Sequence, residues 1–417
     1  MIYTCTPIER PFRATVNVPG SKSVANRALV CAALSSGTST LRNMPSGDDT
    51  EAMLTALIEL GVTVEQVGSA ARITRQQPLQ SANLNAGLAG TTSRFLAALV
   101  ATAECEIGID GGERLRQRPF GPLINALRSL GADIRDSNGG LPLVIQGPLS
   151  GGELDIDATM SSQFISALMM VGPILAGGLK MSLSGELISR PYVELTASVM
   201  EMFGVHVDFS SHEIAVAEQP YSAATVNVEA DASSASYPLA IATATGSTVT
   251  IEGFGTTSHQ GDVFIVEILQ MMGATVISSE STTTVSRDGD SPLRGIDLDM
   301  SEISDLVPTV AALACFATTA TRIRGVGFIR AKESDRIGDL AHELRKFGAA
   351  IEEHPDGLTI TPKPLHGAIV ETHDDHRLAM AFSIVGACIP GVQIADAGVV
   401  SKSWPTYWDD LALMLNS

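Results

Sequence analysis

The sequence predicts an α/β fold built from six similar units, each about 70 residues long. Two repeated features support this prediction. The first is an apolar residue, a glycine and a small or β-branched residue, which is typical of a helix that ends at a glycine before a strand. It occurs at Leu60-Gly61-Val62, Leu130-Gly131-Ala132, Phe203-Gly204-Val205, Met272-Gly273-Ala274 and Phe347-Gly348-Ala349. A sixth unit would close near Leu411 to Leu415.

The second repeated feature is a polar helix start that precedes an apolar, alanine-rich run. The six starts are Ser21-Lys22-Ser23, Gly90-Thr91-Thr92-Ser93-Arg94, Ser161-Ser162-Gln163, Asp231-Ala232-Ser233-Ser234, Ser304-Asp305 and Asp374-Asp375-His376-Arg377. Capping alone would explain the Ser, Thr and Asp residues, because their side chains satisfy the unpaired N–H groups of a helix start. It does not explain the neighbouring Lys, Arg and Gln residues. A helix N-terminus attracts anions, so the six starts predict an anion site shared by two three-unit cores.

Strand-like runs follow the helix starts, for example Thr40-Leu41-Arg42 and Thr248-Val249-Thr250-Ile251. Alternating strands and helices of this length are typical of βαβ layers. Apolar residues make up 45% of the 417 residues and charged residues 18%, which predicts a folded chain of two or three domains.

The charge balance restricts the partners of this chain. The net charge of −19 argues against a nucleic-acid or anionic-membrane partner, and it makes any cluster of the 27 basic residues informative. The five cysteines show no metal-ligand spacing, which favours reduced thiols in a cytoplasmic protein. The longest apolar stretch, from Phe164 to Leu179, contains Pro173 and three glycines, so no membrane span is predicted.

The most informative single segment is Gly20-Ser21-Lys22-Ser23-Val24-Ala25-Asn26-Arg27, which combines a glycine, two hydroxyls and two cations at one helix start. Further polar motifs follow it in order. They are Ala89-Gly90-Thr91 with Arg94, Arg118-Pro119, Ser161-Ser162-Gln163-Phe164, Ser189-Arg190-Pro191-Tyr192, Asp231-Ala232-Ser233-Ser234, Lys332-Glu333-Ser334-Asp335-Arg336, Asp375-His376-Arg377 and Ser401-Lys402-Ser403. With these motifs, the chain resembles the 5-enolpyruvylshikimate-3-phosphate synthase family over essentially its full length.

The resemblance implies two similar domains, each made of three βαβαββ units with pseudo-three-fold symmetry, and an active site in the cleft between the domains. The expected boundaries are residues 21–229 for the N-terminal domain and 1–20 plus 230–417 for the C-terminal domain, with crossovers near residues 20 and 230. The resemblance also implies a cytoplasmic monomer that closes its domains on anionic substrates and uses no metal or cofactor.

The family's reaction transfers the enolpyruvyl group of phosphoenolpyruvate to the 5-hydroxyl of shikimate 3-phosphate, through a tetrahedral intermediate, and releases phosphate. Each substrate carries a phosphate and a carboxylate, so fixed cations must surround them. The candidate cations are eight of the 27 basic residues, namely Lys22, Arg27, Arg94, Arg118, Lys332, Arg336, Arg377 and Lys402.

The resemblance assigns a role to each matching residue. Asp305 would be the base at the hydroxyl and Glu333 the acid near the methylene carbon, while Lys22, with Lys402 as a second candidate, would stabilise the tetrahedral intermediate. The residues expected at shikimate 3-phosphate are Lys22, Ser23, Arg27, Ser161, Ser162, Gln163, Ser189, Asp305 and Lys332. Those expected at phosphoenolpyruvate are Lys22, Gly90, Arg118, Gln163, Arg336, Arg377 and Lys402. Gly90 is expected there because a residue without a Cβ lets the backbone approach the ligand closely.

Two alternative functions stay open. One is enolpyruvyl transfer to UDP-N-acetylglucosamine, which typically uses a loop cysteine, whereas Cys31 and Cys315 lie in apolar helical runs. The other is a non-catalytic protein of the same fold that binds phosphorylated metabolites, and it would not require Asp305 and Glu333. Two residues depart from the family's commonest pattern, Leu88 and Phe328.

Overall fold

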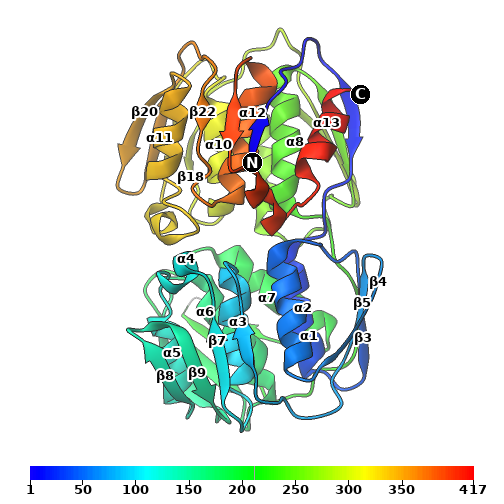
Figure 1. Cartoon of the computed structure of the whole chain (residues 1–417), viewed down its shortest axis with the longest axis vertical. Helices are drawn as coiled ribbons and strands as arrows, with labels where there is room; N and C mark the ends of the chain where they lie inside the picture. Colours follow the sequence, from blue (N-terminus) through cyan, green and yellow to red (C-terminus); the bar gives the residue numbers. More distant parts are fainter. Residues whose placement is uncertain (211) are drawn as a thin grey trace. The chain divides into compact units, whose positions relative to one another are not determined.

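The computed structural model describes residues 1–210 and 212–417, and these residues form two compact units. The N-terminal unit is Gly20–Val228, and the C-terminal unit combines Met1–Pro19 with Glu229–Ser417. Each unit has its own continuous hydrophobic core. In the colours of Figure 1, the C-terminal unit runs from green to red and also contains the blue N-terminal strands.

Five four-stranded sheets share one strand order, which is the predicted repeat. In the sheet β6-β7-β9-β8, β6 (Asn83–Asn85) pairs in parallel with β7 (Ile107–Asp110), and the antiparallel strands β9 (Gly140–Gln146) and β8 (Asp133–Ser137) follow. The parallel pair requires a crossover helix, and the antiparallel pair is a hairpin. Together these connections give the expected βαβαββ unit.

The other four sheets repeat this order. They are β14 (Thr225–Asn227), β3 (Thr38–Arg42), β5 (Ala70–Thr74) and β4 (Thr63–Val67); β10 (Gly152–Asp157), β11 (Leu179–Ser184), β13 (Glu213–Val216) and β12 (Asp208–Phe209); β2 (Arg13–Val16), β15 (Thr248–Glu252), β17 (Thr282–Ser286) and β16 (Thr275–Ser278); and β18 (Asp297–Asp299), β19 (Thr321–Arg324), β21 (Gly357–Thr361) and β20 (Ala350–His354).

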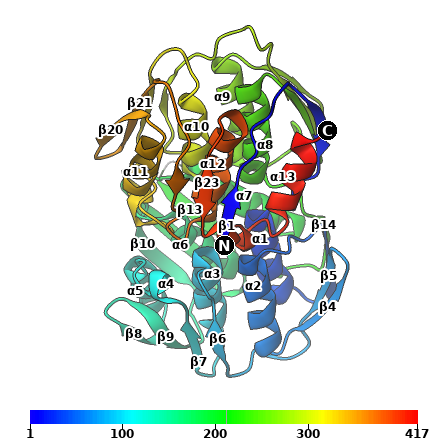
Figure 2. The same ribbon diagram turned by 45° about the horizontal axis from the view of Figure 1, so that its top comes forward.

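The sixth sheet takes one of its strands from the other end of the chain. β22 (Ile369–Val370) pairs in parallel with β23 (Gln393–Ala395), and β1 (Ile2–Thr4) adds to β23 in antiparallel orientation. Figure 2 shows β1 beside β23. The first strand therefore completes the last repeat, which gives each unit three repeats.

Each unit buries three helices in its centre. They are α1 (Lys22–Leu34), α3 (Gly90–Val100) and α6 (Ser162–Val171) in the N-terminal unit, and α8 (Ala232–Thr245), α10 (Val307–Ala314) and α12 (His376–Cys388) in the C-terminal unit. Almost every residue of these helices is buried. They are buried on all sides, as expected of helices inside a core.

The remaining helices bury only one stripe each. They are α2 (Asp48–Glu59), α4 (Glu113–Arg116), α5 (Gly121–Ser129), α7 (Arg190–Met202), α9 (Ile265–Met271), α11 (Gly338–Lys346) and α13 (Tyr407–Leu415). Short 3-10 turns occur at Gly172–Ile174, Gly261–Phe264, Ser304–Leu306, Gly327–Ala331 and Ala397–Lys402. Among the described residues, no helix has the length and apolar content needed to cross a bilayer.

The five predicted helix-ending glycines are confirmed by their backbone conformation. Gly61, Gly131, Gly204, Gly273 and Gly348 have φ angles of 87°, 103°, 82°, 110° and 94°. A side chain is disfavoured at such positive φ values, which explains why glycine recurs there. The sixth repeat differs, because Asn416 rather than a glycine follows the last residue of α13, Leu415.

Candidate functional site

The starts of the buried helices carry the predicted residues, although side chains cap only four of the six. Ser21, Ser161, Asp231 and Asp375 accept backbone N–H groups at the starts of α1, α6, α8 and α12. Ala89 occupies the cap position of α3 and Leu306 that of α10, and neither has a side chain that can accept a hydrogen bond. The prediction of polar caps is therefore wrong at these two starts.

At the start of α1, Lys22 forms an ion pair with a carboxylate of the next helix, Asp49. The Lys22 Nζ atom lies 2.8 Å from Oδ2 of Asp49, and both side chains are largely buried. Asp49 lies in the first turn of α2, whose cap position is Gly47. An ammonium group has three N–H donors, and Asp49 is the one partner of Lys22 among the described residues, so two donors remain for a ligand.

One turn further along α1, neutral protein groups hold Arg27. Its guanidinium donates to Thr196 Oγ1 (2.7 Å) and to the carbonyls of Ser23 (2.8 Å) and Tyr192 (3.0 Å). It also donates to Ser166 Oγ and lies 5.2 Å from the Phe95 ring centroid. Burial lowers its pKa to about 10. Arg27 thus fixes α1 against α6 and α7, and among the described residues one N–H on its NH1 atom has no partner.

Gly90 and Gln163 meet at a second arginine, Arg94. The Arg94 NH1 atom donates to the Gly90 carbonyl and to Gln163 Oε1, each at 3.0 Å, and its NH2 atom donates to the Pro119 carbonyl at 3.0 Å. The guanidinium also stacks near Phe120 and Phe164. Arg94 therefore ties α3 to α6 at their N-terminal ends.

The structure shows why position 90 is occupied by glycine, which could not be predicted from the sequence. A Cβ atom built there would overlap the Arg118 guanidinium and would lie 2.7 Å from NH1 of Arg94. We had expected a glycine at this position so that a ligand could approach the backbone. In the structure, two arginine side chains approach it instead, so Gly90 allows two cations to converge at the start of α3.

Three of the remaining predicted residues of this unit lie at helix starts. Ser161 caps α6 through Gln163 N–H, and Ser162 is the first residue of the helix. Ser189 is buried at the start of α7 with a φ of 52°, in the left-handed region. A buried residue held in this sparsely populated conformation is typical of binding sites.

In the C-terminal unit, a fully buried arginine gathers three carboxylates. Arg336 donates through Nε and NH2 to Asp375 (2.7 and 3.2 Å) and through NH1 to Asp305 Oδ1 (2.8 Å). Its NH2 atom also lies 2.9 Å from Oε2 of Glu333. The forked guanidinium suits this bidentate arrangement. Burial would lower the pKa of Arg336, but Asp375, Glu333 and Asp305 raise it above its ordinary value.

Asp305 lies between two arginines. Its second oxygen accepts a hydrogen bond from NH2 of Arg377 at 2.7 Å. Burial would raise the pKa of Asp305, but Arg377, Arg336 and Lys332 together hold it below its ordinary value. Asp305 is therefore ionised at neutral pH, and in this state it is a weak base.

Glu333 lies between two cations, because Lys402 Nζ is 3.4 Å from the oxygen that does not face Arg336. The structure thus brings together Asp305, Glu333, Arg336, Arg377 and Lys402 in one unit. Lys332 lies beside them, 5.9 Å from the ring centroid of Phe328. Phe328, one of the two departures from the family pattern, therefore contacts a predicted substrate-binding residue. The other, Leu88, is 41% exposed.

Sequence reasoning missed two carboxylates of this cluster. Asp375 was interpreted as a cap, and it does accept Arg377 N–H, but it also holds the Arg336 fork. Asp262 is buried and hydrogen-bonded to Ser233. Burial, and then Asp305, raise the pKa of Asp262 to about 6. Among the described residues, no group of His, Cys, Asp and Glu has the arrangement of a metal site.

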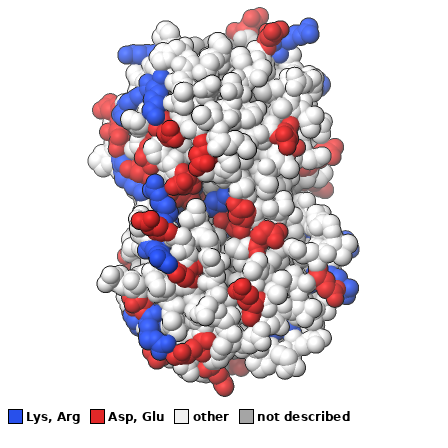
Figure 3. Space-filling view, viewed as in Figure 1, with Lys and Arg blue, Asp and Glu red and all other residues white. Residues whose placement is uncertain are grey.

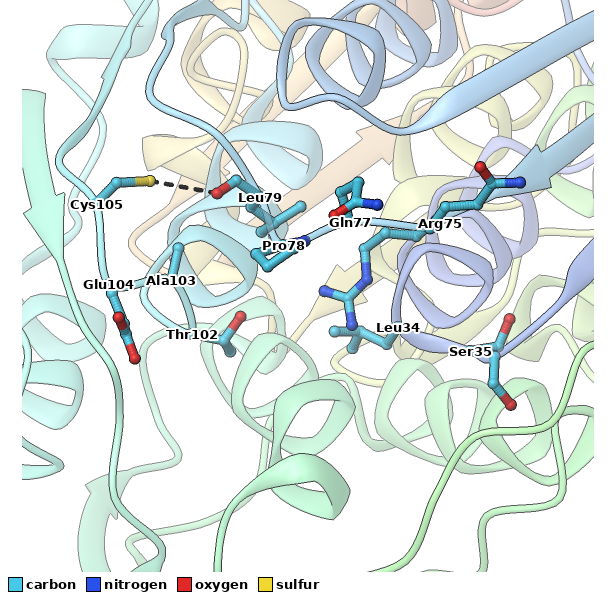
Figure 4. Close-up of a pocket in the computed structure, with 12 residues that line it drawn as sticks. Leu34, Ser35, Arg75, Gln77, Pro78, Leu79, Thr102, Ala103, Glu104 and Cys105 are labelled. Atoms are coloured by element: carbon cyan, nitrogen blue, oxygen red, sulfur yellow. Dashed lines mark hydrogen bonds between the residues drawn. The ribbon is translucent and has the colours of Figure 1, made fainter.

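A cavity of about 750 Å³ in the N-terminal unit does not fit an anionic ligand. It lies where α1 and α3 end, between Leu34, Arg75, Leu79 and Thr102, and Figure 4 shows the Arg75 side chain pointing toward Leu34. Helix C-termini carry negative partial charge, and Glu104 adds a carboxylate. We therefore place the candidate site at the helix N-termini. Figure 3 shows acidic and basic residues interspersed on one face of the surface.

The comparisons with known proteins agree with the motifs. The family model for EPSP synthase (3-phosphoshikimate 1-carboxyvinyltransferase) matches residues 7–411. The chain belongs to the EPSP synthase family. It is 39% identical over 419 residues to the 3-phosphoshikimate 1-carboxyvinyltransferase of Nostoc punctiforme, covering 98% of each chain. It is 41% identical over 428 residues to that of Vibrio cholerae, again covering 98% of each.

Solved structures of this family have the same fold. The EPSP synthase of Acinetobacter baumannii superposes with a TM-score of 0.82 at 26% identity, covering 99% of this chain and 98% of that one. The resemblance drawn from the ordered motifs and the predicted fold class are thus confirmed.

Proposed function

We propose that this protein is a transferase that moves the enolpyruvyl group of phosphoenolpyruvate to the 5-hydroxyl of shikimate 3-phosphate and releases phosphate. The family match over residues 7–411 carries the proposal. The buried cations at the helix starts supply the chemistry that two phosphorylated carboxylic acids require. The product would serve chorismate and aromatic amino acid biosynthesis in the cytoplasm. The enzyme would act as a monomer, without a metal or cofactor and without a nucleic-acid or membrane partner.

The N-terminal unit would hold most of shikimate 3-phosphate. Ser161, Ser162 and Gln163 present one hydroxyl-rich helix start, and Lys22 and Ser23 present another. Arg27 would contribute a single N–H group, because its other donors bind protein groups. Ser189 and, from the C-terminal unit, Asp305 and Lys332 would complete the contacts.

Phosphoenolpyruvate would bind a second set of predicted residues, which shares Lys22 and Gln163 with the first. They are Lys22, Gly90, Arg118 and Gln163 in the N-terminal unit, and Arg336, Arg377 and Lys402 in the C-terminal unit. Arg336 and Arg377 are already neutralised by carboxylates. An incoming anion would therefore share these arginines with Asp305 rather than find them unpaired.

This sharing would make Asp305 a usable base. The two arginines hold its pKa below the ordinary value. Negative charge on the bound substrate would offset their pull, so the pKa of Asp305 would rise toward the range in which it accepts the hydroxyl proton. Asp305 would thus become basic only when the substrate is bound.

Glu333 would deliver the second proton, to the methylene carbon. Its position between Arg336 and Lys402 suits a group that alternates between acid and base as addition gives way to elimination. Lys22 and Lys402 would stabilise the tetrahedral intermediate and the departing phosphate.

A coupled phosphate-release assay tests the proposed function. Phosphate should appear from phosphoenolpyruvate only when shikimate 3-phosphate is present. UDP-N-acetylglucosamine, the alternative acceptor, should give no turnover. Equal or faster turnover with UDP-N-acetylglucosamine would refute the proposal, and tight binding of both substrates without phosphate release would favour a non-catalytic binding protein.

A further inference from the structure

We propose that Glu343 is a positioning residue, which holds the loop between β22 and α12 so that Arg336 and Arg377 are oriented for the anionic substrate. This inference rests on the proposed function and extends it to a residue outside the predicted site. Glu343 lies on α11, and its side chain is completely buried.

Three donors converge on the Glu343 carboxylate. Its Oε1 atom lies 2.9 Å from Nε2 of His373, and its Oε2 atom accepts the backbone N–H of Glu371 at 2.9 Å. Lys346 Nζ, one turn along α11, lies 2.9 and 2.7 Å from the two oxygens. Two of the three donors belong to the loop between β22 and α12, so a buried charge on α11 anchors this loop.

The loop has a backbone conformation that needs an anchor. His373 and Asp374 are consecutive residues with φ angles of 53° and 60°. Residues other than glycine rarely adopt left-handed conformations, and such conformations persist where the surrounding contacts over-determine them. The hydrogen bonds from Glu371 N–H and from the His373 ring fix the loop two residues before the first left-handed residue and at that residue.

The residues that follow the loop belong to the arginine cluster. Asp375 N–H donates to the Thr372 carbonyl at 2.9 Å, and the Asp375 side chain then accepts Arg377 N–H. The same carboxylate accepts two hydrogen bonds from the Arg336 guanidinium. A shift of the loop would therefore move Asp375, and with it the orientation of both arginines.

Other charged groups around His373 do not provide an equivalent anchor. Asp339 Oδ1 lies 3.6 Å from His373 Nδ1, beyond hydrogen-bond distance. His342 is exposed, and its Nε2 lies 3.9 Å from Glu343 Oε1. The contact of His373 with Glu343, at 2.9 Å, is therefore shorter than its contact with Asp339.

Glu343→Gln and His373→Asn test the inference, with Lys346→Met as the matched control. A carboxamide accepts through one oxygen only, so Glu343→Gln must lose at least one of the converging donors. His373→Asn removes the ring contact but keeps a residue that tolerates positive φ. Lys346→Met also removes a partner of Glu343, but that partner does not belong to the loop.

We expect the first two variants to raise KM for phosphoenolpyruvate about tenfold. KM for shikimate 3-phosphate should change less than about twofold, since most of its proposed contacts belong to the N-terminal unit. The double variant should be no worse than the more affected single one, because both act through one contact. Equal effects of Lys346→Met and His373→Asn, or an unchanged KM for phosphoenolpyruvate in His373→Asn, would overturn the inference.

Hydrogen exchange gives a readout that does not depend on activity. Backbone amides of residues 371–377 should exchange faster in His373→Asn than in the parent protein, and Lys346→Met should match the parent. If the parent releases no phosphate with shikimate 3-phosphate, the proposed function fails while this measurement still tests the loop. Identical exchange in His373→Asn and the parent would overturn the positioning role.

Discussion

The two units hold the buried arginines of the candidate site in different ways. In the N-terminal unit, hydroxyls, carbonyls and an aromatic ring surround Arg27 among the described residues. In the C-terminal unit, carboxylates neutralise Arg336 and Arg377. Cations held by neutral groups keep their charge for an anionic ligand. Cations paired with carboxylates instead tune the proton affinity of those carboxylates, so we assign anion binding mainly to the first unit and proton transfer to the second.

The largest expected effect tests that division. Asp305→Asn keeps the shape of the side chain but cannot accept a proton, so kcat should fall on the order of 10³-fold while both substrates still bind. The corresponding change in the N-terminal unit is Asp49→Asn, at the partner of Lys22, and it should lower kcat less than about tenfold. Steady-state kinetics and substrate titration by calorimetry measure both effects.

A surface carboxylate provides the control for Asp305→Asn. Asp299 forms an exposed pair with Arg324, and Asp299→Asn should leave kcat unchanged. If Asp305→Asn retained more than about a tenth of the parent kcat, or if Asp49→Asn lost as much as Asp305→Asn, the division of roles between the units would be wrong.

The next effect in size concerns stability, and one arginine variant in each unit tests it. Arg336→Met leaves three carboxylates without their buried arginine, which should cost about 3–5 kcal/mol. Arg27→Met leaves only carbonyl and hydroxyl acceptors unpaired, which should cost about 1–3 kcal/mol. The two losses should therefore differ in size even though both arginines are buried.

The tryptophans allow the two units to be followed separately. The chain has two, Trp404 and Trp408, and both belong to the C-terminal unit. In urea titrations, Arg336→Met should shift the transition seen by tryptophan fluorescence. Arg27→Met should shift the circular dichroism transition more than the fluorescence transition. Equal losses of unfolding free energy in the two variants would contradict the proposed difference between neutral and charged partners.

Local features of the fold could be predicted from the sequence. The helix-ending glycines and four of the helix caps depend on neighbours within a few residues, so spacing alone locates them. Long-range partners could not be predicted in this way. The pairing of Lys22 with Asp49 joins two helices, and the fork between Arg336 and Asp375 joins residues 39 positions apart. A carboxylate near a helix start is equally compatible with a cap and with an ion pair.

Predictions that depended on a ligand were the least specific. Gly90 was expected for close approach of a substrate, but the structure shows two arginines beside it. Asp305 was predicted to be a base from the motif. The structure shows that two arginines lower its pKa, so Asp305 is a weak base before a substrate binds. The identity of a residue limits what it can do, whereas its neighbours determine its pKa.

The smallest expected effect is the loss of stability that closely spaced carboxylates cause in the C-terminal unit. Burial and Asp305 raise the pKa of Asp262 to about 6, above the ordinary value near 3.9. A carboxyl group with a raised pKa in the folded state favours folding below about pH 4, and this contribution is lost as the pH rises through about 6. At pH 8, the ionised Asp262 should therefore destabilise the fold by on the order of 2–3 kcal/mol.

Asp262→Asn should remove that cost, since an amide does not ionise and can still accept the Ser233 hydroxyl. The fluorescence-detected unfolding free energy should exceed that of the parent at pH 8, and the difference should disappear near pH 4. Asp297→Asn, which changes an exposed partner of Arg324, should show no such pH-dependent difference. A stability gain independent of pH would mean that better packing, rather than relief of carboxylate repulsion, stabilises the variant. Carboxylate crowding would then not distinguish the two units.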